Sequence, residues 1–512
     1  MLSRVFSAGL LGIDGFLVEV EVDIAQGLAN WNTVGLPESS VKESRDRVIA
    51  AVKNSGYSFE RRRITINLAP ADVKKEGTAF DLPIALGLLA SSELIPPERL
   101  EDSLFLGELS LHGEVKPIHG ALSIALLAKK KKIRKLILPE KNAHEASVIP
   151  EVSVFAVRHL ADVVGHVTGE RPLEPKGPAQ ARSPQSPHPS LHALDFSEIK
   201  GQTQAKRALE VAAAGGHNVM MIGPPGSGKT MLAQRLPTIL PPMSFEEALE
   251  TSKVYSVVGL LRERETLVTE RPFRSPHHTI STAGLAGGGT HPRPGEVSLA
   301  HNGVLFLDEL PEFPRNVLEI LRQPLESGII TIARALTTLT FPARATLIAS
   351  MNPCRCGFLG SKLKECVCTA VAVQKYRGRV SGPLLDRIDI QIEVPPVPFG
   401  ELTAVAEGES SERIRGRVLK AREIQKKRFG ASKIHANAQM TGRLLRKHAE
   451  IDAEGSGLLE KAVARLSLSA RAYDRILKVA RTIADLEAAP RIRTQHLAEA
   501  IHYRSLDRNY GM

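Results

Sequence analysis

One octapeptide constrains the fold of this 512-residue chain more than any other feature. The segment GPPGSGKT (223–230) fits the pattern G-x-x-x-x-G-K-[ST]. It follows the apolar run Val219–Ile222 and precedes the helix-forming sequence MLAQRL. In that context the loop N–H groups and the N-terminal end of the next helix form a cradle for phosphate. The chain is therefore predicted to contain an α/β domain with a parallel sheet that binds ATP.

Every residue of this loop is a candidate ligand of the nucleotide. Lys229 is expected to reach the β- and γ-phosphates, and the Thr230 hydroxyl to bind Mg²⁺. The predicted nucleotide-binding residues of the loop are Gly223, Pro224, Pro225, Gly226, Ser227, Gly228, Lys229 and Thr230.

Two further apolar runs end in polar side chains. GVLFLDEL (303–310) delivers Asp308 and Glu309 to the carboxyl end of a strand, where ligands bind in open α/β sheets. Asp308 is predicted to hold the Mg²⁺ shell and Glu309 to activate the attacking water. TLIASMNP (346–353) brings Asn352 beside them, either to bind the water or γ-phosphate or simply to cap a turn.

Composition divides the chain into four segments. Residues 1–170 mix alternating strands with helices, and residues 171–195 form a proline-rich linker with too few large apolar residues for a core. Residues 196–400 hold the short apolar strands typical of a parallel sheet. Residues 401–512 are predicted to be helical.

The net charge of +11 favours a polyanionic partner, nucleic acid first, although a basic cytosolic enzyme is the alternative. Most of this excess lies in residues 401–512, with 22 basic against 14 acidic side chains. No apolar run reaches eighteen residues, so no membrane span is predicted.

The four cysteines lie within fifteen residues, as Cys354, Cys356, Cys366 and Cys368. Four thiolates suit a tetrahedral structural Zn²⁺ site, and free thiols or disulfides are the alternatives. The crowding does not resemble a secreted disulfide framework, so a reducing cytoplasm is expected.

The order of GPPGSGKT, VLFLDEL, ASMNP, SGPLLDRID (381–389) and LSARAYDRILKVARTIADL (468–486) resembles the magnesium-chelatase-related branch of AAA+ ATPases. With VGLPESSVKESRDRV and NLAPADVKKEGTAFDLPIAL added, nearly the whole chain resembles the ComM/YifB family. The resemblance implies an AAA+ P-loop core with a helical lid in a Mg-chelatase C-terminal domain. An α+β Lon-protease-like, ribosomal-protein-like domain would precede them.

The resemblance also implies roles for two arginines. Arg387 in LLDRID matches the arginine finger that acts on ATP held by a neighbouring subunit, which implies a ring, most simply a homo-hexamer. A structural ion pair with Asp386 or Asp389 is the alternative. Arg471 matches the sensor-2 arginine of the lid, and its alternative is a solvated charge on a basic helix.

Two insertions match elements that point into the ring pore in this branch. Residues 272–303 correspond to the helix-2 insert, and residues 328–347 are predicted to form the pre-sensor-1 hairpin. Arg334, beside the turn of that hairpin, would contact a phosphate backbone or remain a surface arginine.

The Lon-like segment lacks both members of the protease dyad. Ala79 occupies the serine position, and the segment that matches the lysine, PIHGALSIA, has no lysine. Thr78 and Ser123 lie nearby, but no activating base accompanies them. The domain is therefore predicted to be non-proteolytic. The DNA-repair ATPase RadA carries a similar module, which favours a role in assembly or nucleic-acid binding.

The favoured function is an ATP-driven motor on single-stranded or branched DNA, a helicase or branch-migration factor in recombination or natural transformation. A chelatase-type motor subunit that remodels a protein partner is the main alternative. An ATP-dependent protease is disfavoured by the missing dyad. An enhancer-binding activator is disfavoured because the insert reads TAGLAGGG and not GAFTGA.

Overall fold

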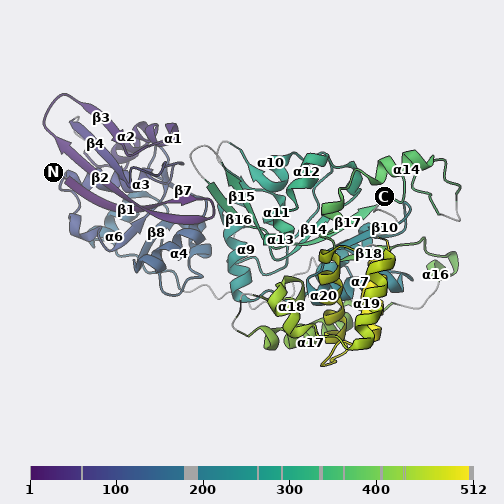
Figure 1. Cartoon of the computed structure of the whole chain (residues 1–512). Helices are drawn as coiled ribbons and strands as arrows, with labels where there is room; N and C mark the ends of the chain where they lie inside the picture. The colour runs from purple at the N-terminus through teal and green to yellow at the C-terminus, as the bar shows by residue number, and fades with distance from the viewer. Residues whose placement is uncertain are drawn as a thin grey trace. The chain divides into compact units, whose positions relative to one another are not determined.

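The computed structural model describes residues 2–58, 62–177, 194–261, 265–289, 292–333, 338–360, 364–403, 408–430, 432, 434–466 and 468–506 (Figure 1). The chain divides into two compact units. One holds the described residues up to 177 together with Phe245–Thr269, and the other holds the remaining described residues. Most of the predicted linker 171–195 lies outside the described residues, because 178–193 are not among them.

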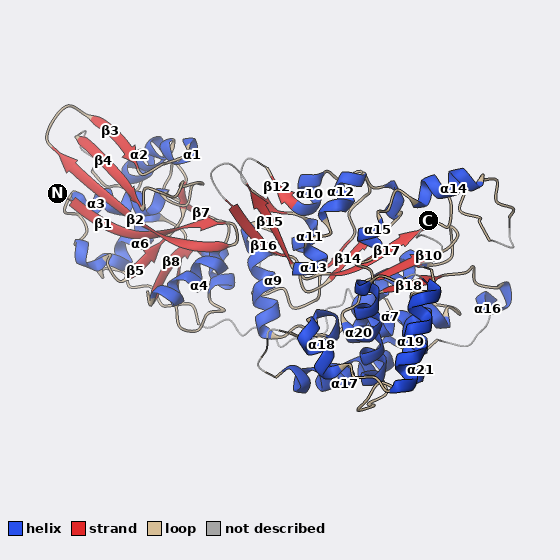
Figure 2. Ribbon diagram, viewed as in Figure 1, coloured by secondary structure: helices blue, strands red, loops and turns tan. Residues whose placement is uncertain are grey.

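The N-terminal unit is built on a seven-stranded mixed sheet of order β3-β4-β2-β1-β5-β8-β9 (Figure 2). The long hairpin of β1 (Leu2–Leu11) and β2 (Asp14–Ala25) forms because their residues alternate between core and solvent, with Val18, Val20 and Val22 fully buried. The other strands of this sheet are β3 (Asn30–Val34), β4 (Arg63–Ala69), β5 (Ser103–Phe105), β8 (Lys135–Pro139) and β9 (Ser153–Val157).

Helix α3 (Asp81–Ser91) fills the core of this unit. All of its residues are buried, it contacts β1 and β2, and Pro83 occupies its first turn, where no N–H partner is lost. The remaining elements are α1 (Ser39–Lys42), α2 (Ser44–Asn54), α4 (Ala121–Lys131), α5 (Ala143–Ala146), α6 (Leu160–Thr168) and the short pair β6 (Glu108–Leu109) and β7 (Val115–Lys116).

The N-terminal unit also includes a segment from within the predicted ATPase range. Helix α9 (Phe245–Val257) packs against α4. The Gly120 N–H donates to the Ser256 carbonyl at 3.1 Å, and the Ser256 hydroxyl donates to buried Glu145 at 2.7 Å. Burial raises the pKa of Glu145, while hydrogen bonds from Asn142 and Ser256 oppose that shift. The N-terminal unit is thus completed by residues that follow the nucleotide-binding loop in sequence.

The second unit contains a five-stranded sheet of order β11-β14-β17-β10-β18, in which every pair is parallel. The three inner strands are buried along nearly their whole length, which explains why their sequences are continuous apolar runs. The strands are β10 (Val219–Ile222), β11 (Phe273–Arg274), β14 (Val304–Leu307), β17 (Thr346–Met351) and β18 (Ile390–Glu393).

Helices connect these strands, as the parallel arrangement requires. They include α8 (Lys229–Ile239), α10 (Thr282–Ala286), α11 (Glu296–Leu299), α12 (Arg315–Ile320), α13 (Pro324–Ser327), α14 (Ala370–Arg377) and α15 (Gly382–Leu385). Helix α7 (Thr203–Gly215) precedes the first strand, β10, and α16 (Phe399–Thr403) follows the last, β18.

The predicted helical C-terminal segment packs on this sheet domain. Helix α17 (Ser411–Phe429) contacts α7 and α8, α20 (Ala470–Leu486) contacts α7, and their buried residues join one hydrophobic core with β10 and β18. The other lid helices are α18 (Gly442–His448), α19 (Ala453–Leu466) and α21 (Thr494–His502). Within the described chain, we find no helix with the length and apolar character needed to cross a membrane.

Each predicted insertion contains a pair of antiparallel strands, referred to below as its hairpin. β15 (Ile329–Ala333) pairs with β16 (Thr338–Pro342), and β12 (Gly287–Gly288) pairs with β13 (Arg293–Pro294). The two hairpins lie side by side, since a Cβ on Gly287 would come within 3.1 Å of Ile332. Arg334 lies outside the described residues, so its predicted role stays a prediction.

Candidate functional site

The three motif-bearing strands place their polar residues at one edge of the sheet. β10 pairs with β17 and β17 with β14, all in parallel, so that Ile222 is level with Met351, and Leu307 with Ala349. The phosphate-binding loop follows β10, Asp308 follows β14 and Asn352 follows β17. The sheet order thus brings together side chains that the sequence separates by more than a hundred residues.

The phosphate-binding loop depends on its glycines. Gly226 and Gly228 have φ values of +74° and +90°, a region that favours glycine, and the turn they make starts α8 at Lys229. A Cβ on Gly223 would lie 2.1 Å from the Val394 carbonyl oxygen, so that position also requires glycine. The N–H groups of the first turn of α8 therefore face the loop, as phosphate binding needs.

Lys229 points into the loop. Its ammonium donates to the carbonyls of Gly223 at 2.7 Å and Pro224 at 2.8 Å, and lies 3.4 Å from the Asn352 side-chain oxygen. Burial lowers the pKa of Lys229, whereas the carboxylates of Asp308 and Glu309 raise it. These contacts bring Lys229 and Asn352 together. A bound γ-phosphate would compete with the two backbone carbonyls for the hydrogen bonds of the Lys229 ammonium.

Asp308 is held by hydroxyl groups on two sides. Thr230 donates to one carboxylate oxygen at 2.9 Å, and Ser350 donates to the other, which also accepts the Glu309 N–H at 3.0 Å. A hydroxyl and a carboxylate in contact are the protein ligands that a nucleotide-bound Mg²⁺ uses. Ser350 was not identified from the sequence, although it is a polar residue that interrupts the apolar run of β17.

Glu309 lies at the open side of this site. Its backbone is left-handed with φ of +53°, and 55% of its side chain is exposed. The His278 Nδ1 lies 3.7 Å from its carboxylate, and the His278 ring contacts the rings of His277 and Phe313. His278 was missed because its position follows β11, which joins the sheet beside β14. From this contact we expect His278 to help position Glu309.

Replacing His278 with alanine is expected to lower the ATPase kcat roughly tenfold, while KM for ATP stays within about twofold. A misplaced base affects the chemical step and not binding. Steady-state hydrolysis measured over a range of ATP concentrations checks this. His278→Asn, which keeps a side-chain nitrogen near the position of Nδ1, is the comparison, because His277 packs on the His278 ring and is not an independent control. Equal effects of the two substitutions would contradict the positioning role.

Arg387 lies at the opposite edge of the sheet. It precedes β18, whose Ile390 pairs with Val219 at the amino end of β10. Its guanidinium donates to the Pro383 carbonyl at 2.8 Å and to Glu326, and its carbonyl accepts from Asn218. Four residue steps along β10 cover about 13 Å, which separates this edge from the phosphate loop of the same chain. Its observed ion-pair partner is Glu326, not Asp386 or Asp389.

Two arginines of the lid helix α20 have different surroundings from Arg387. Arg475 pairs with buried Asp389. Burial opposes ionisation of Asp389, but Arg475 and His217 keep its pKa below the ordinary value. Arg471 is exposed and has no hydrogen bond or ion pair within the described residues. The pKa of Glu326 is lowered mainly by its hydrogen bond with Arg387, and the nearby charge of Arg471 lowers it further.

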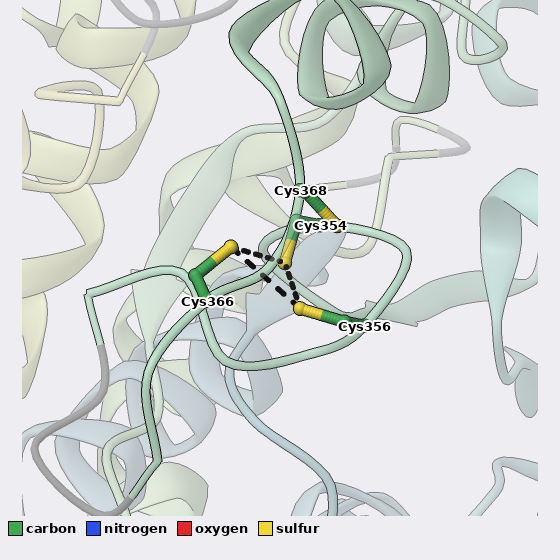
Figure 3. A group of neighbouring side chains, drawn as sticks. All are labelled: Cys354, Cys356, Cys366 and Cys368. Atoms are coloured by element: carbon green, nitrogen blue, oxygen red, sulfur yellow. Dashed lines mark hydrogen bonds between the residues drawn. The ribbon is translucent and has the colours of Figure 1, made fainter.

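The four cysteines lie together in the loop after β17 (Figure 3). All four are free thiols, and their sulfur atoms all lie within 4.8 Å of one another. The Sγ separations are 3.3 Å for Cys354–Cys356, 3.7 Å for Cys354–Cys366 and 3.6 Å for Cys356–Cys366. Tetrahedral Zn²⁺ with bonds of about 2.3 Å requires sulfurs about 3.8 Å apart, so the donor set fits this metal.

In the N-terminal unit, Ser123 is not arranged as a nucleophile, whereas the Thr78 hydroxyl contacts a carboxylate that the sequence did not indicate. Thr78 donates to Glu108, and Ser123 is buried and donates to the Ile13 carbonyl at 2.7 Å. A nucleophilic hydroxyl needs a base that accepts its proton and an open face toward substrate, and buried Ser123 has neither.

The parallel sheet, the phosphate loop, the Asp–Glu pair on a neighbouring strand and the helical lid define the second unit as an AAA+ ATPase domain. Family models agree: residues 195–402 match the model for magnesium chelatase, subunit ChlI, and residues 408–504 match its C-terminal model. Residues 20–142 match the model for subunit ChlI of Mg-chelatase.

Full-length relatives identify the family. The chain is 45% identical over 509 residues to the competence protein ComM of Haemophilus influenzae, covering 99% of this chain and 98% of that one. It is 45% identical over 508 residues, with the same coverage, to the uncharacterized protein YifB of Salmonella typhimurium. The chain therefore belongs to the ComM/YifB family. A 172-residue match at 26% identity to Lon protease 2 of Herpetosiphon aurantiacus, covering 31% of this chain and 21% of that one, supports the Lon-like prediction.

Proposed function

We propose that the protein is a cytoplasmic, homo-hexameric ATPase motor that moves along DNA, as a helicase or branch-migration factor in recombination or natural transformation. Hydrolysis of Mg²⁺-bound ATP drives this movement. The observation that carries the proposal is the placement of Arg387 at the sheet edge opposite the phosphate loop. An arginine finger at that edge serves only the ATP of a neighbouring subunit, and a ring supplies such a neighbour to every subunit.

Charge and shape support DNA as the substrate. The two adjacent hairpins, β12–β13 and β15–β16, are the elements that a ring would direct into its pore. The lid helices add exposed cations that suit a phosphate backbone, namely Arg413, Arg415, Lys420, Lys426, Lys427, Arg443, Arg446 and Lys447. The similarity to a relative named competence protein supports the proposed role in natural transformation.

We expect single-stranded and branched DNA to stimulate the ATPase severalfold at low salt, and the stimulation to fall steeply as salt rises, because counterion release drives phosphate contacts. Hydrolysis rates at 50 and 200 mM salt, with a blunt duplex as the comparison, measure this. If no DNA substrate changes the rate of ATP hydrolysis at low salt, the choice of DNA as the substrate is contradicted.

A chelatase-type motor that remodels a protein partner remains the second candidate, because the family models that match both the core and the lid are those of a magnesium chelatase subunit. That function predicts an ATPase indifferent to DNA and stimulated by a protein partner. The salt-dependent DNA assay separates the two candidates.

A further inference from the structure

The four-cysteine centre adjoins the nucleotide site through one glycine. Gly357 follows Cys356, has φ of +86°, and lies so close to Pro225 of the phosphate loop that an added Cβ would be 2.6 Å from the proline Cδ. The Gly357 N–H donates to the Cys354 carbonyl at 3.0 Å. The turn that presents two of the sulfurs is therefore the same turn that packs on the phosphate loop.

A second connection runs through the strand that precedes the cysteines. The Met351 carbonyl accepts the Gly223 N–H at 3.2 Å, and Asn352, the next residue, contacts Lys229. Cys354, fully buried, stands two residues beyond Asn352. Fixing Cys354 thus fixes the end of β17 from which both contacts to the phosphate loop are made.

Helix α14 closes this connection from the other side of the centre. It begins two residues after Cys368, and its Arg377 donates to the Pro353 carbonyl at 3.1 Å. Burial raises the pKa of Tyr376 to about 12, and a hydrogen bond to the Asn352 backbone opposes that shift. The chain on either side of the cysteines therefore returns to the residues that touch the phosphate loop.

We propose that metal bound by the four cysteines sets the affinity of the nucleotide site, by holding the Gly357 turn against Pro225 and the Asn352 segment against Lys229. Without the metal, the four side chains would be protonated thiols with no shared ligand to hold them together, and the turn would lose its fixed position. This inference rests on the nucleotide-binding role of the phosphate loop and is independent of DNA.

Two glycine variants of the full chain separate the contact from the metal. Gly357→Ala places a methyl group against Pro225, whereas Gly360→Ala meets nothing within 4 Å although its φ is similar, at +74°. Both substitutions carry the same left-handed backbone strain, so their difference reports the contact with Pro225. Zinc content and the Kd for a fluorescent ATP analogue with Mg²⁺ are measured for each.

We expect Gly357→Ala to retain zinc and raise the Kd about tenfold, while Gly360→Ala changes the Kd less than about twofold. Removing zinc from the unsubstituted protein with a zinc-selective chelator, under reducing conditions and excess Mg²⁺, is expected to raise the Kd similarly. If Gly357→Ala also loses zinc, only the chelation experiment is used to decide whether zinc sets the nucleotide affinity. Unchanged affinity in the zinc-depleted protein, or equal affinities of the two glycine variants when both retain zinc, would overturn the proposal.

Discussion

Replacing Glu309 with glutamine is expected to reduce the ATPase kcat by about 10²- to 10⁴-fold and to leave ATP binding within about twofold of normal, because a general base acts on the chemical step. Glutamine keeps the shape of the side chain but cannot accept the proton of water. Hydrolysis under saturating ATP, together with the Kd for a fluorescent ATP analogue, measures both effects.

Lys229→Ala is the comparison for this experiment. It removes the ammonium that lies among the loop carbonyls and beside Asn352. We expect it to abolish both nucleotide binding and turnover, since Lys229 contacts the phosphates in the ground state as well. Weak ATP binding by Glu309→Gln, or full turnover by that variant, would contradict the separation of roles between the two residues.

Arg387→Ala has the second large expected effect: on the proposed role as an arginine finger, kcat should fall by about 10³- to 10⁵-fold. The Arg387 side chain is itself only 9% exposed, so the thermal unfolding midpoint of the variant is measured beside kcat, and the loss is assigned to catalysis only where that midpoint is retained. Arg379→Ala, which breaks a more exposed pair with Glu312, is a control for the loss of an arginine–glutamate pair in the same domain and should retain activity.

Mixing two inactive variants tests whether Arg387 acts between subunits. Arg387→Ala subunits retain the phosphate loop, and Lys229→Ala subunits retain the finger. In a randomly mixed ring about one site in four combines the two intact halves, so mixing is expected to recover about a quarter of the activity. An arginine that serves its own chain would give no recovery.

The sequence was sufficient to predict those features that depend on short, local patterns. The strand before Gly223 and the one that ends at Asp308 are continuous apolar runs because each is buried on both faces. The hydrophobic alternation of β2 likewise follows from one buried face. Similarly, the cysteine spacing was enough to suggest a metal centre, since the ligands lie within fifteen residues.

Features that depend on tertiary contacts were not predictable in this way. His278 faces Glu309 only because β11 pairs with β14, and Ser350 reaches Asp308 only across neighbouring strands. The partner of Arg387 is Glu326, sixty-one residues away, and not the aspartates beside it in sequence. Helix α9 joins the N-terminal unit through packing on α4, which no local pattern indicated.

Strand displacement on a forked DNA substrate tests the central claim most directly. With ATP and Mg²⁺, the unsubstituted protein is expected to release the displaced strand in proportion to ATP hydrolysed, and Glu309→Gln is expected to bind the fork without releasing the strand. Robust ATP hydrolysis with no displacement of forked or branched DNA at low salt would contradict the account of a DNA motor.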